Sequence, residues 1–479
     1  MERSASHIER LRDGSTVATI GGGPAGSFFA MHFLLQARAR NMRMRAVIFE
    51  ARHSPSRKHP GNLFGPYKGC PRCAAGISPR LHDALTELGM RIPGNILQKR
   101  IRSIAVSGDW KPVCLNIPEG REMLSVFRGT LPHARKLSHD SFDEFLIDTA
   151  RRQGAELIGS SVNRIFYDND RRPVICYDIA GQEKQLKVDF VVFACGVNAK
   201  ITSGSGRESA TGLFRALQPA YRPPPLRKAL IVELAAPRDW PELRAGRLHY
   251  TESSTEDLRL EMCSILPKDG FFTVTLIGGS IDDAASKGDN LEVISKFLST
   301  PPVRRILPAS GEVHIRCICT PSISVGTSNM PYAHRAAAIG DMAATRLYKD
   351  GILAAHDMAK DLAGVILERG IDADAIAKGY GPTVSRFQSD NRYARLIFFL
   401  YRWIFASQTW SRIVYQTCAS ERKSKPQTRR SFEEIFWAIS SGDKDYREIA
   451  WAMIRPATIW QILTGGLLIT IRNQPVSYT

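Results

Sequence analysis

The sequence of 479 residues has no uninterrupted apolar run near the roughly 18 residues that a membrane-spanning helix needs. Its amino-terminal segment has no apolar core, so we do not expect a secretory signal. Nine cysteines are too few for a disulfide framework and are expected to be mostly reduced thiols. The composition, 43 % apolar and 23 % charged, excludes wholesale disorder. We therefore expect a cytoplasmic protein, with peripheral attachment to the inner face of a membrane as an alternative.

The chain is short of acidic residues. Asp and Glu number 47 against 65 Lys and Arg, which gives a net charge of +18. Such a surface attracts nucleic acid, anionic lipid headgroups or a phosphorylated small molecule. No base-reading module accompanies the charge, so nucleic acid is the least favoured of these partners.

The beginning of the chain has the pattern of a strand–helix–strand unit. Residues 15–20 are β-branched and apolar, residues 21–26 read Gly-Gly-Gly-Pro-Ala-Gly, and residues 27–35 have helical character. A second apolar strand, residues 45–49, ends at Glu50. Gly-x-Gly-x-x-Gly between strand and helix, followed by an acid after the next strand, is typical of dinucleotide binding. The alternative is a glycine-rich turn without chemical consequence.

Each residue of that pattern has a chemical reason. Gly21 permits a tight turn, Gly23 lets the backbone approach a pyrophosphate, and Gly26 allows the helix to pack closely on the strand. The helix start offers free N–H groups and a partial positive charge to the diphosphate. Glu50 can accept hydrogen bonds from ribose hydroxyls and would repel a 2′-phosphate, which favours FAD or NAD over NADP.

Two later segments resemble the other flavin elements of glutathione-reductase-type flavoproteins. Residues 336–339 are expected to form a strand that ends in Gly340 and Asp341, and a helix is expected to begin near Gly351. Residues 188–196 resemble the third shared element, a strand ending in Ala-Cys-Gly. The order of the elements favours FAD as the cofactor.

That resemblance implies roles for the later residues. Asp341, in the turn with Gly340, would bond a ribityl hydroxyl of FAD. Gly351 and Ile352, at the start of the following helix, would face the pyrimidine of the isoalloxazine, where the helix dipole stabilises the reduced flavin. An ordinary turn aspartate is the alternative for Asp341.

Within this superfamily the chain is most similar to the geranylgeranyl reductase group, which is related to para-hydroxybenzoate hydroxylase and the flavin halogenases. The similarity lies in Cys-Ala-Ala-Gly-Ile-Ser-Pro at 73–79, Val-Phe-Arg-Gly at 126–129 and the turn around residues 266–274. Arg128 is a candidate on the phosphate side of the cofactor, or else a solvent-facing arginine. Cys195 stands where the hydroxylases usually carry an aspartate, which disfavours simple aromatic hydroxylation.

The resemblance implies an FAD-dependent oxidoreductase that acts on a small hydrophobic substrate, lipid or isoprenoid-like, and reduces a carbon–carbon double bond. NAD(P)H is the expected electron donor. One alternative is a monooxygenase or halogenase-like enzyme of secondary metabolism. Another, from a different class, is a non-catalytic lipid carrier on the same fold.

The cysteine pair Cys70 and Cys73 leaves several interpretations open. The two thiols could form a redox disulfide beside the flavin, or join Cys317 and Cys319 in a metal site, which the spacing disfavours. The group resemblance instead implies that Cys73 lines the active-site wall and gives a proton to the reduced double bond. We predict Cys73 as the catalytic residue and no metal site.

The fold class that follows is α/β, with a glutathione-reductase-type FAD-binding Rossmann domain, an inserted β-rich substrate domain and a C-terminal helical region. The expected FAD domain comprises residues 15–58, 132–200 and 331–372, the substrate domain residues 59–131 and 201–330, and the C-terminal region residues 373–479.

The C-terminal region is basic and rich in aromatic residues. Two apolar stretches, residues 393–410 and 459–471, flank a segment at 421–430 in which five of ten residues are basic. One interpretation is a helical subdomain with buried aromatic residues. The other is a platform on an anionic membrane surface, with Trp and Phe at the acyl boundary and Arg and Lys on headgroups.

Overall fold

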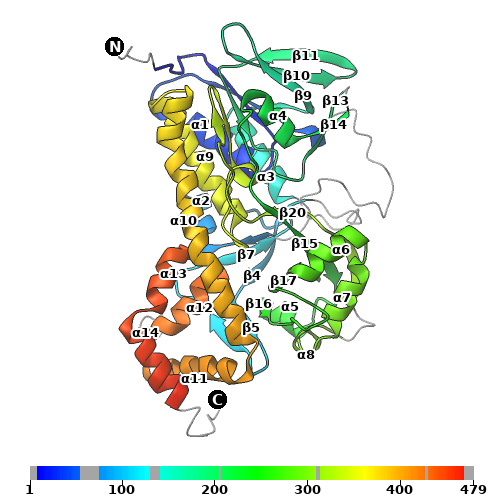
Figure 1. Ribbon diagram of the computed structural model, residues 1–479, viewed down its shortest axis with the longest axis vertical. Coiled ribbons are helices and arrows are strands. Elements are labelled where there is room, and N and C mark those ends of the chain that lie inside the picture. Colours follow the sequence, from blue (N-terminus) through cyan, green and yellow to red (C-terminus); the bar gives the residue numbers. More distant parts are fainter. Residues whose placement is uncertain are drawn as a thin grey trace.

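The computed structural model describes residues 8–53, 75–129, 141–203, 206–308, 313–426 and 430–468. Figure 1 shows an elongated molecule in which a parallel sheet and its helices occupy one half. A large, mostly antiparallel sheet and the C-terminal helices occupy the other half. The long helix α10 (Ala373–Phe405) extends along both halves.

The parallel sheet has six strands, and its order differs from the order along the chain. The strands in spatial order are β21 (Tyr332–Ala333), β22 (Ala336–Ala338), β12 (Phe190–Phe193), β1 (Thr16–Ile20), β2 (Arg45–Phe49) and β8 (Glu156–Ile158). All neighbours are parallel except β21 and β22. In register, Ile20 pairs with both Phe49 and Phe193. The carboxyl ends of β1, β2, β12 and β22 therefore lie along one edge.

Three helices pack together beside this sheet. Helix α1 (Pro24–Ala39) packs against α9 (Gly351–Glu368) and α3 (Phe142–Arg152). Helix α1 is apolar on most sides, and its phenylalanines Phe28 and Phe33 are fully buried, as expected for a helix that neighbours surround. The Ser141 hydroxyl accepts a hydrogen bond from the Glu144 N–H and so begins α3.

The second large sheet has eight strands. They are, in spatial order, β19 (His314–Cys319), β15 (Leu226–Ala235), β18 (Phe271–Ile277), β17 (Met262–Lys268), β16 (Arg247–Thr251), β5 (Ser103–Ser107) and β6 (Val113–Asn116), with β20 (Ser322–Ser324) paired to β15. Only β16 and β5 run parallel among these pairs. The sheet thus combines strands from two separate parts of the chain.

Three small sheets and further short helices complete the N-terminal three quarters of the described chain. The small sheets contain β3 (Ala75–Ile77), β7 (Met123–Val126) and β4 (Leu97–Ile101); β11 (Gln182–Lys187), β10 (Pro173–Ile179) and β9 (Val162–Tyr167); and β13 (Lys200–Ser203) and β14 (Gly206–Ser209). The helices are α2 (Pro79–Glu87), α4 (Ala210–Leu217), α5 (Pro241–Ala245), α6 (Gly279–Lys287), α7 (Asn290–Ser299) and α8 (Pro301–Arg304), with single turns η1 (Ala51–His53) and η2 (Gly340–Met342).

The C-terminal part is helical throughout its described residues. After α10 come α11 (Gln408–Ser424), α12 (Ser431–Ser441), α13 (Tyr446–Met453), α14 (Pro456–Gln461) and the π-helical turn η4 (Ile462–Leu467). The chain breaks the apolar stretch 393–410 between α10 and α11, where the Ser407 hydroxyl caps α11. Within the described ranges, no helix is both long and apolar enough to cross a bilayer.

Candidate functional site

The glycine-rich segment forms a tight turn that tolerates no side chain at two positions. Gly21 has a φ of +105°, and a Cβ there would lie 2.6 Å from the carbonyl oxygen of Ala194. A Cβ on Gly26 would lie 1.9 Å from the carbonyl oxygen of Gly21. Gly23 differs, because a Cβ there would meet no atom of the described structure within 4 Å. Gly21 and Gly26 therefore shape the turn, whereas Gly23 borders open space.

The start of α1 beside this turn is suited to an anion. Gly23 is the N-cap and offers no side chain, Pro24 follows it, and the first turn holds no acidic residue. The first N–H groups of a helix have no partner within the helix, and the helix dipole adds positive charge there. A diphosphate is the ligand that this end would attract.

The structure brings the three distant flavin-like elements together at one edge of the parallel sheet. Gly21 at the end of β1 touches Ala194 and Cys195 at the end of β12. Gly340, at the end of β22 with a φ of +62°, lies so close to α1 that its Cβ would be 3.0 Å from the Cβ of Ala25. The early glycine turn and the late Gly340–Asp341 turn therefore lie side by side, and we call the open space that Gly23 borders next to them the groove.

Glu50 occupies the place at the end of β2 that the sequence predicts, but it has a partner that the sequence analysis missed. Its carboxylate accepts the Gly22 N–H at 2.8 Å, the Arg52 N–H at 2.9 Å and Arg52 Nε at 3.0 Å. Burial would raise the pKa of Glu50, but the charge of Arg52 and these hydrogen bonds outweigh burial, so the pKa lies below its usual value. Glu50 is therefore an ionised, fully bonded carboxylate.

Arg128 continues this charge network toward Asp341. Its Nε and Nη2 donate to the two carboxylate oxygens of the buried Asp143 at 3.1 and 3.0 Å. Arg52 Nη1 lies 3.9 Å from the same carboxylate. Charges of alternating sign thus run from Glu50 through Arg52, Asp143 and Arg128 to Asp341, and Arg128 is a paired arginine rather than a solvent-facing one.

Asp341 has no hydrogen-bond partner for its carboxylate among the described residues. Burial raises the pKa of Asp341 above its usual value, although the charge of Arg128 opposes the shift. A half-buried carboxylate that lacks donors is a site for a ligand that brings hydroxyl donors.

The start of α9 lies next to this turn along the chain. Asp350 is the N-cap in a left-handed conformation, and its carboxylate pairs with Arg346 at 3.1 Å rather than with the N–H groups of the helix. No acidic residue lies in the first turn, so no carboxylate offsets the partial positive charge of the helix dipole at the N–H groups around Gly351 and Ile352. A Cβ on Gly351 would make only an ordinary 3.5 Å contact with Thr345, so sterics do not require glycine there.

A small pocket of about 20 Å³ lies beside the segment that leads into α9. Its lining comes from β16, β17, α10, α12 and neighbouring segments: Tyr250, Thr251, Glu252, Leu260, Glu261, Met262, Cys263, Lys349, Phe398, Tyr401, Ile439 and Ser440. Most of these side chains are apolar or aromatic. As it stands the pocket has room for about one water molecule, so a hydrophobic substrate would have to widen it.

The Lys349 amine is the notable polar group of this cavity. Its Nζ donates to Tyr250 Oη at 2.5 Å and to the carbonyl oxygen of Ser440 at 2.8 Å, and it lies 3.8 Å from the centre of the Tyr250 ring. Burial lowers the pKa of Lys349 to about 7, and nearby Asp350 only partly opposes this. Burial likewise raises the pKa of Glu252 in the same cavity to about 7. The cavity wall thus holds groups that exchange protons near neutral pH.

The sequence analysis missed this cluster. Lys349 carries one sequence signal, because it immediately precedes the predicted Asp350–Gly351 helix start, but Tyr250 lies in a strand without a motif. The predicted catalytic residue Cys73 and its neighbour Cys70 lie outside the described residues, so the structure does not test their roles. Among the described residues, no group of three or more His, Cys, Asp or Glu side chains is arranged to hold a metal ion.

We compared the sequence and the structure of the chain with those of known proteins. No family model and no curated protein matches the sequence. Solved structures do match: a geranylgeranyl bacteriochlorophyll reductase-like protein from Thermoplasma acidophilum has a TM-score of 0.60 and 14 % identity, covering 96 % of this chain and 98 % of that one. The fold is that of the FAD-binding flavoproteins.

Two more structures support the assignment of the fold. A flavoprotein/dehydrogenase from Cytophaga hutchinsonii has a TM-score of 0.58 at 13 % identity and covers 96 % of this chain and 100 % of its own. The p-nitrophenol 4-monooxygenase PnpA from Pseudomonas putida has a TM-score of 0.52 at 14 % identity, with 95 % and 99 % covered. The fold class predicted from the sequence is confirmed.

The groove is compatible with FAD on three counts and requires one adjustment. Gly23 borders open space at an uncapped helix start, Asp341 lacks donors, and the start of α9 has no acidic residue. The adjustment is at Glu50, whose carboxylate already accepts four hydrogen bonds, three of them from Arg52. Ribose hydroxyls can reach Glu50 when the Arg52 side chain releases it.

Proposed function

We propose that this protein is an FAD-dependent oxidoreductase that reduces a carbon–carbon double bond of a hydrophobic, lipid or isoprenoid-like substrate. The observation that carries the proposal is the position of Lys349. Its Nζ lies in the wall of the small, largely apolar pocket, and its backbone leads directly into the start of α9. A proton donor and a hydrophobic cavity therefore adjoin the predicted flavin end of the groove.

The groove residues would hold the cofactor along its length. Gly21, Gly23 and Gly26 would place the diphosphate against the start of α1, and Glu50 would bind the ribose. Asp341 would accept from a ribityl hydroxyl. Arg128 stays paired to Asp143 and would supply positive charge on the phosphate side.

The pyrimidine end would face α9. The N–H groups around Gly351 and Ile352 carry the positive end of the helix dipole and would stabilise negative charge on the pyrimidine carbonyl. Bound FAD, once reduced with NAD(P)H as the proposed donor, supplies the hydride. NADH and NADPH, added separately without oxygen to the FAD-loaded protein, distinguish the donors by the loss of flavin absorbance.

The chain itself would supply the second hydrogen. Lys349 Nζ–H⁺ gives its proton to the carbon next to the one that receives hydride, so the substrate gains two hydrogens and the amine becomes neutral. Tyr250 Oη and the carbonyl oxygen of Ser440 hold the amine in place. With a pKa of about 7, Lys349 regains a proton from water near neutral pH.

The experiment uses the FAD-loaded protein, reduced under argon, with geranylgeranyl diphosphate and a total lipid extract as probes. A mass gain of two hydrogens on a probe supports the proposal. Incorporation of ¹⁸O from ¹⁸O₂ in place of anaerobic turnover overturns it in favour of a monooxygenase. A colourless protein that does not bind FAD but binds the probes overturns it in favour of a lipid carrier.

A further inference from the structure

The C-terminal helices expose large apolar side chains at high density. All four exposed tryptophans of the chain follow residue 400, namely Trp403, Trp410, Trp451 and Trp460. Buried aromatic residues, including Phe405 and Trp437, fill the interior of the same region. The interior side chains fit the interpretation of a helical subdomain, and the exposed ones need an explanation.

The densest group lies on α13, α14 and η4, and we call it the apolar stripe. It consists of Trp451, Ile454, Ile459, Trp460, Leu463 and Leu468, each between 42 and 67 % exposed. Trp451 and Ile454, the C-cap of α13, are three residues apart at the end of that helix, and Ile459 and Trp460 on α14 are followed one turn later by Leu463 on η4. Only Arg455 and Pro456 separate the two helical segments after Ile454.

The charges around the stripe have one sign. From Ile449 to Leu468 there is no acidic residue, and the exposed Arg455 lies in the middle. Between Asp390 and Glu421, on α10 and α11, four arginines again occur without an acid. The acidic residue next to the stripe is Glu448, one turn before Trp451 and beside the exposed Arg447. This combination of Trp and Ile with Arg is typical of surfaces that bind anionic lipid headgroups.

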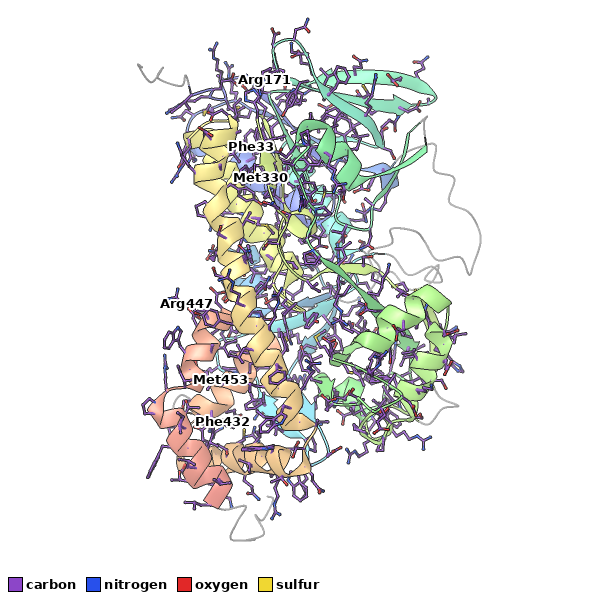
Figure 2. All side chains as sticks on the ribbon, viewed as in Figure 1. Phe33, Arg171, Met330, Phe432, Arg447 and Met453 are labelled. Atoms are coloured by element: carbon purple, nitrogen blue, oxygen red, sulfur yellow. The ribbon has the colours of Figure 1, made fainter. Side chains whose placement is uncertain are left out.

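The same helices are apolar on their inner side as well. A cavity of about 110 Å³ lies beneath the stripe, between α10, α11, α12 and α14, with Met453 and Phe432 among its lining residues. Both residues lie among the C-terminal helices at the lower left of Figure 2. Helices α13, α14 and η4 thus have apolar side chains both toward solvent and toward an incompletely filled interior. Such helices are suited to contact with acyl chains.

We propose that the apolar stripe docks this protein onto an anionic phospholipid bilayer. Trp451, Ile454 and Trp460 would enter the headgroup–acyl boundary, while Arg455 would contact anionic headgroups. The described helices are too short or too polar to cross the bilayer, so the attachment is interfacial and reversible. This inference does not depend on the reaction that the protein catalyses.

The test is flotation of the full-length, FAD-loaded protein with phosphatidylcholine vesicles that contain or lack phosphatidylglycerol. We expect binding to the anionic vesicles, weakened by high salt, and a blue shift of the tryptophan fluorescence. The triple variant W451S/I454S/W460S should lose binding by about ten-fold or more, because three exposed apolar anchors are removed. R455E should weaken binding to anionic vesicles only.

The matched control is L291S, which removes a leucine on α7 that is 65 % exposed and lies outside the C-terminal helices. It should bind vesicles like the unchanged protein. Absence of binding to anionic vesicles, or equal binding by the triple variant, overturns the proposal. So does a dimer in the absence of lipid that the triple variant dissociates, because the stripe would then be an interface between two copies.

Discussion

A side chain on Gly26 would begin 1.9 Å from the carbonyl oxygen of Gly21. Gly26→Ala must therefore move α1 away from β1, and we expect the free energy of unfolding to fall by about 2 kcal/mol or more in urea titrations. Gly23→Ala is the matched comparison, because its Cβ meets nothing and its φ of −68° suits alanine.

The two glycine variants should separate folding from cofactor binding. Gly23→Ala should keep its stability without ligand but lose FAD affinity by about ten-fold, roughly 1.4 kcal/mol, because the methyl group enters the groove. Fluorescence titration with FAD measures this. Unchanged affinity in Gly23→Ala would show that the open side of the turn does not face the cofactor.

Arg52 would compete with the ribose of a bound FAD for the Glu50 carboxylate. Arg52→Met should lower the melting temperature of the FAD-free protein, because a buried carboxylate loses its cation and two side-chain hydrogen bonds. It should also enlarge the rise in melting temperature on adding FAD, because ribose hydroxyls then become the main donors to Glu50. A smaller rise would mean that Arg52 itself contacts the cofactor.

We expect the Asp341 carboxylate to lower the stability of the FAD-free protein and to strengthen FAD binding. Its pKa is raised in the folded state, so the folded protein binds more protons just above pH 3.8 and loses stability as the pH rises through this range. Asp341→Asn should therefore be more stable than the unchanged protein at neutral pH without FAD, by about 1 kcal/mol. Its FAD affinity should fall, because an amide accepts less strongly from a ribityl hydroxyl than a carboxylate does.

The exposed Asp239 supplies the control for this change. Asp239→Asn should alter neither stability nor FAD affinity beyond experimental error, because no partner of this side chain is present among the described residues. If Asp341→Asn behaves in the same way, Asp341 is the ordinary turn aspartate of the alternative interpretation.

A buried ion pair in the eight-stranded sheet should be sensitive to the loss of one partner. Lys268 Nζ lies 3.0 Å from Glu233 Oε1, both side chains are fully buried, and the amine also lies over the Phe127 ring. Lys268→Met leaves the Glu233 charge uncompensated and should cost about 3–5 kcal/mol in chemical unfolding. The double variant Glu233→Gln/Lys268→Met should recover most of this cost. Lys296→Met, at an exposed pair with Glu292, should cost well under about 1 kcal/mol.

The sequence predicted the features of the groove that depend on the backbone. Gly21, Gly26 and Glu50 are tied to strand ends, and parallel strands bring those ends to one edge, so the convergence with Asp341 followed from the order of the elements. Arg52 lies only two residues after Glu50 and was missed because no motif marks it, whereas Asp143 meets Arg128 only once the chain has folded.

The pocket around Lys349 and the apolar stripe were less predictable from the sequence, because they depend on which side chains meet in the folded chain. Lys349 lies 99 residues from Tyr250 and 91 from Ser440 in the sequence, and neither β16 nor α12 has a motif that predicts the contact. The C-terminal helices carry aromatic residues on several sides, so periodicity did not decide that Trp437 is buried and Trp460 exposed. Only the packing of five helices around one another fixes that division.

Lys349 is the residue whose variants test the proton donor directly. Its pKa of about 7 in the folded protein lies below the usual 10.5, so between these values the unfolded chain binds the extra proton. Stability should therefore rise with pH from about 7 to 10.5. Lys349→Met should lack this rise and be more stable than the unchanged protein below pH 7.

The same variant should lose turnover. The rate of double-bond reduction should fall above pH 7 as the Lys349 amine loses its proton, and Lys349→Met should be slower by about 10²-fold or more at pH 7. Lys349→Arg keeps the charge but does not release the proton, so it should be slow with no pKa near 7. The exposed Lys423→Met is the control and should keep the full rate and profile. A pH profile unchanged in Lys349→Met would assign the proton to another group, for which Cys73 and Glu252 are the next variants to measure.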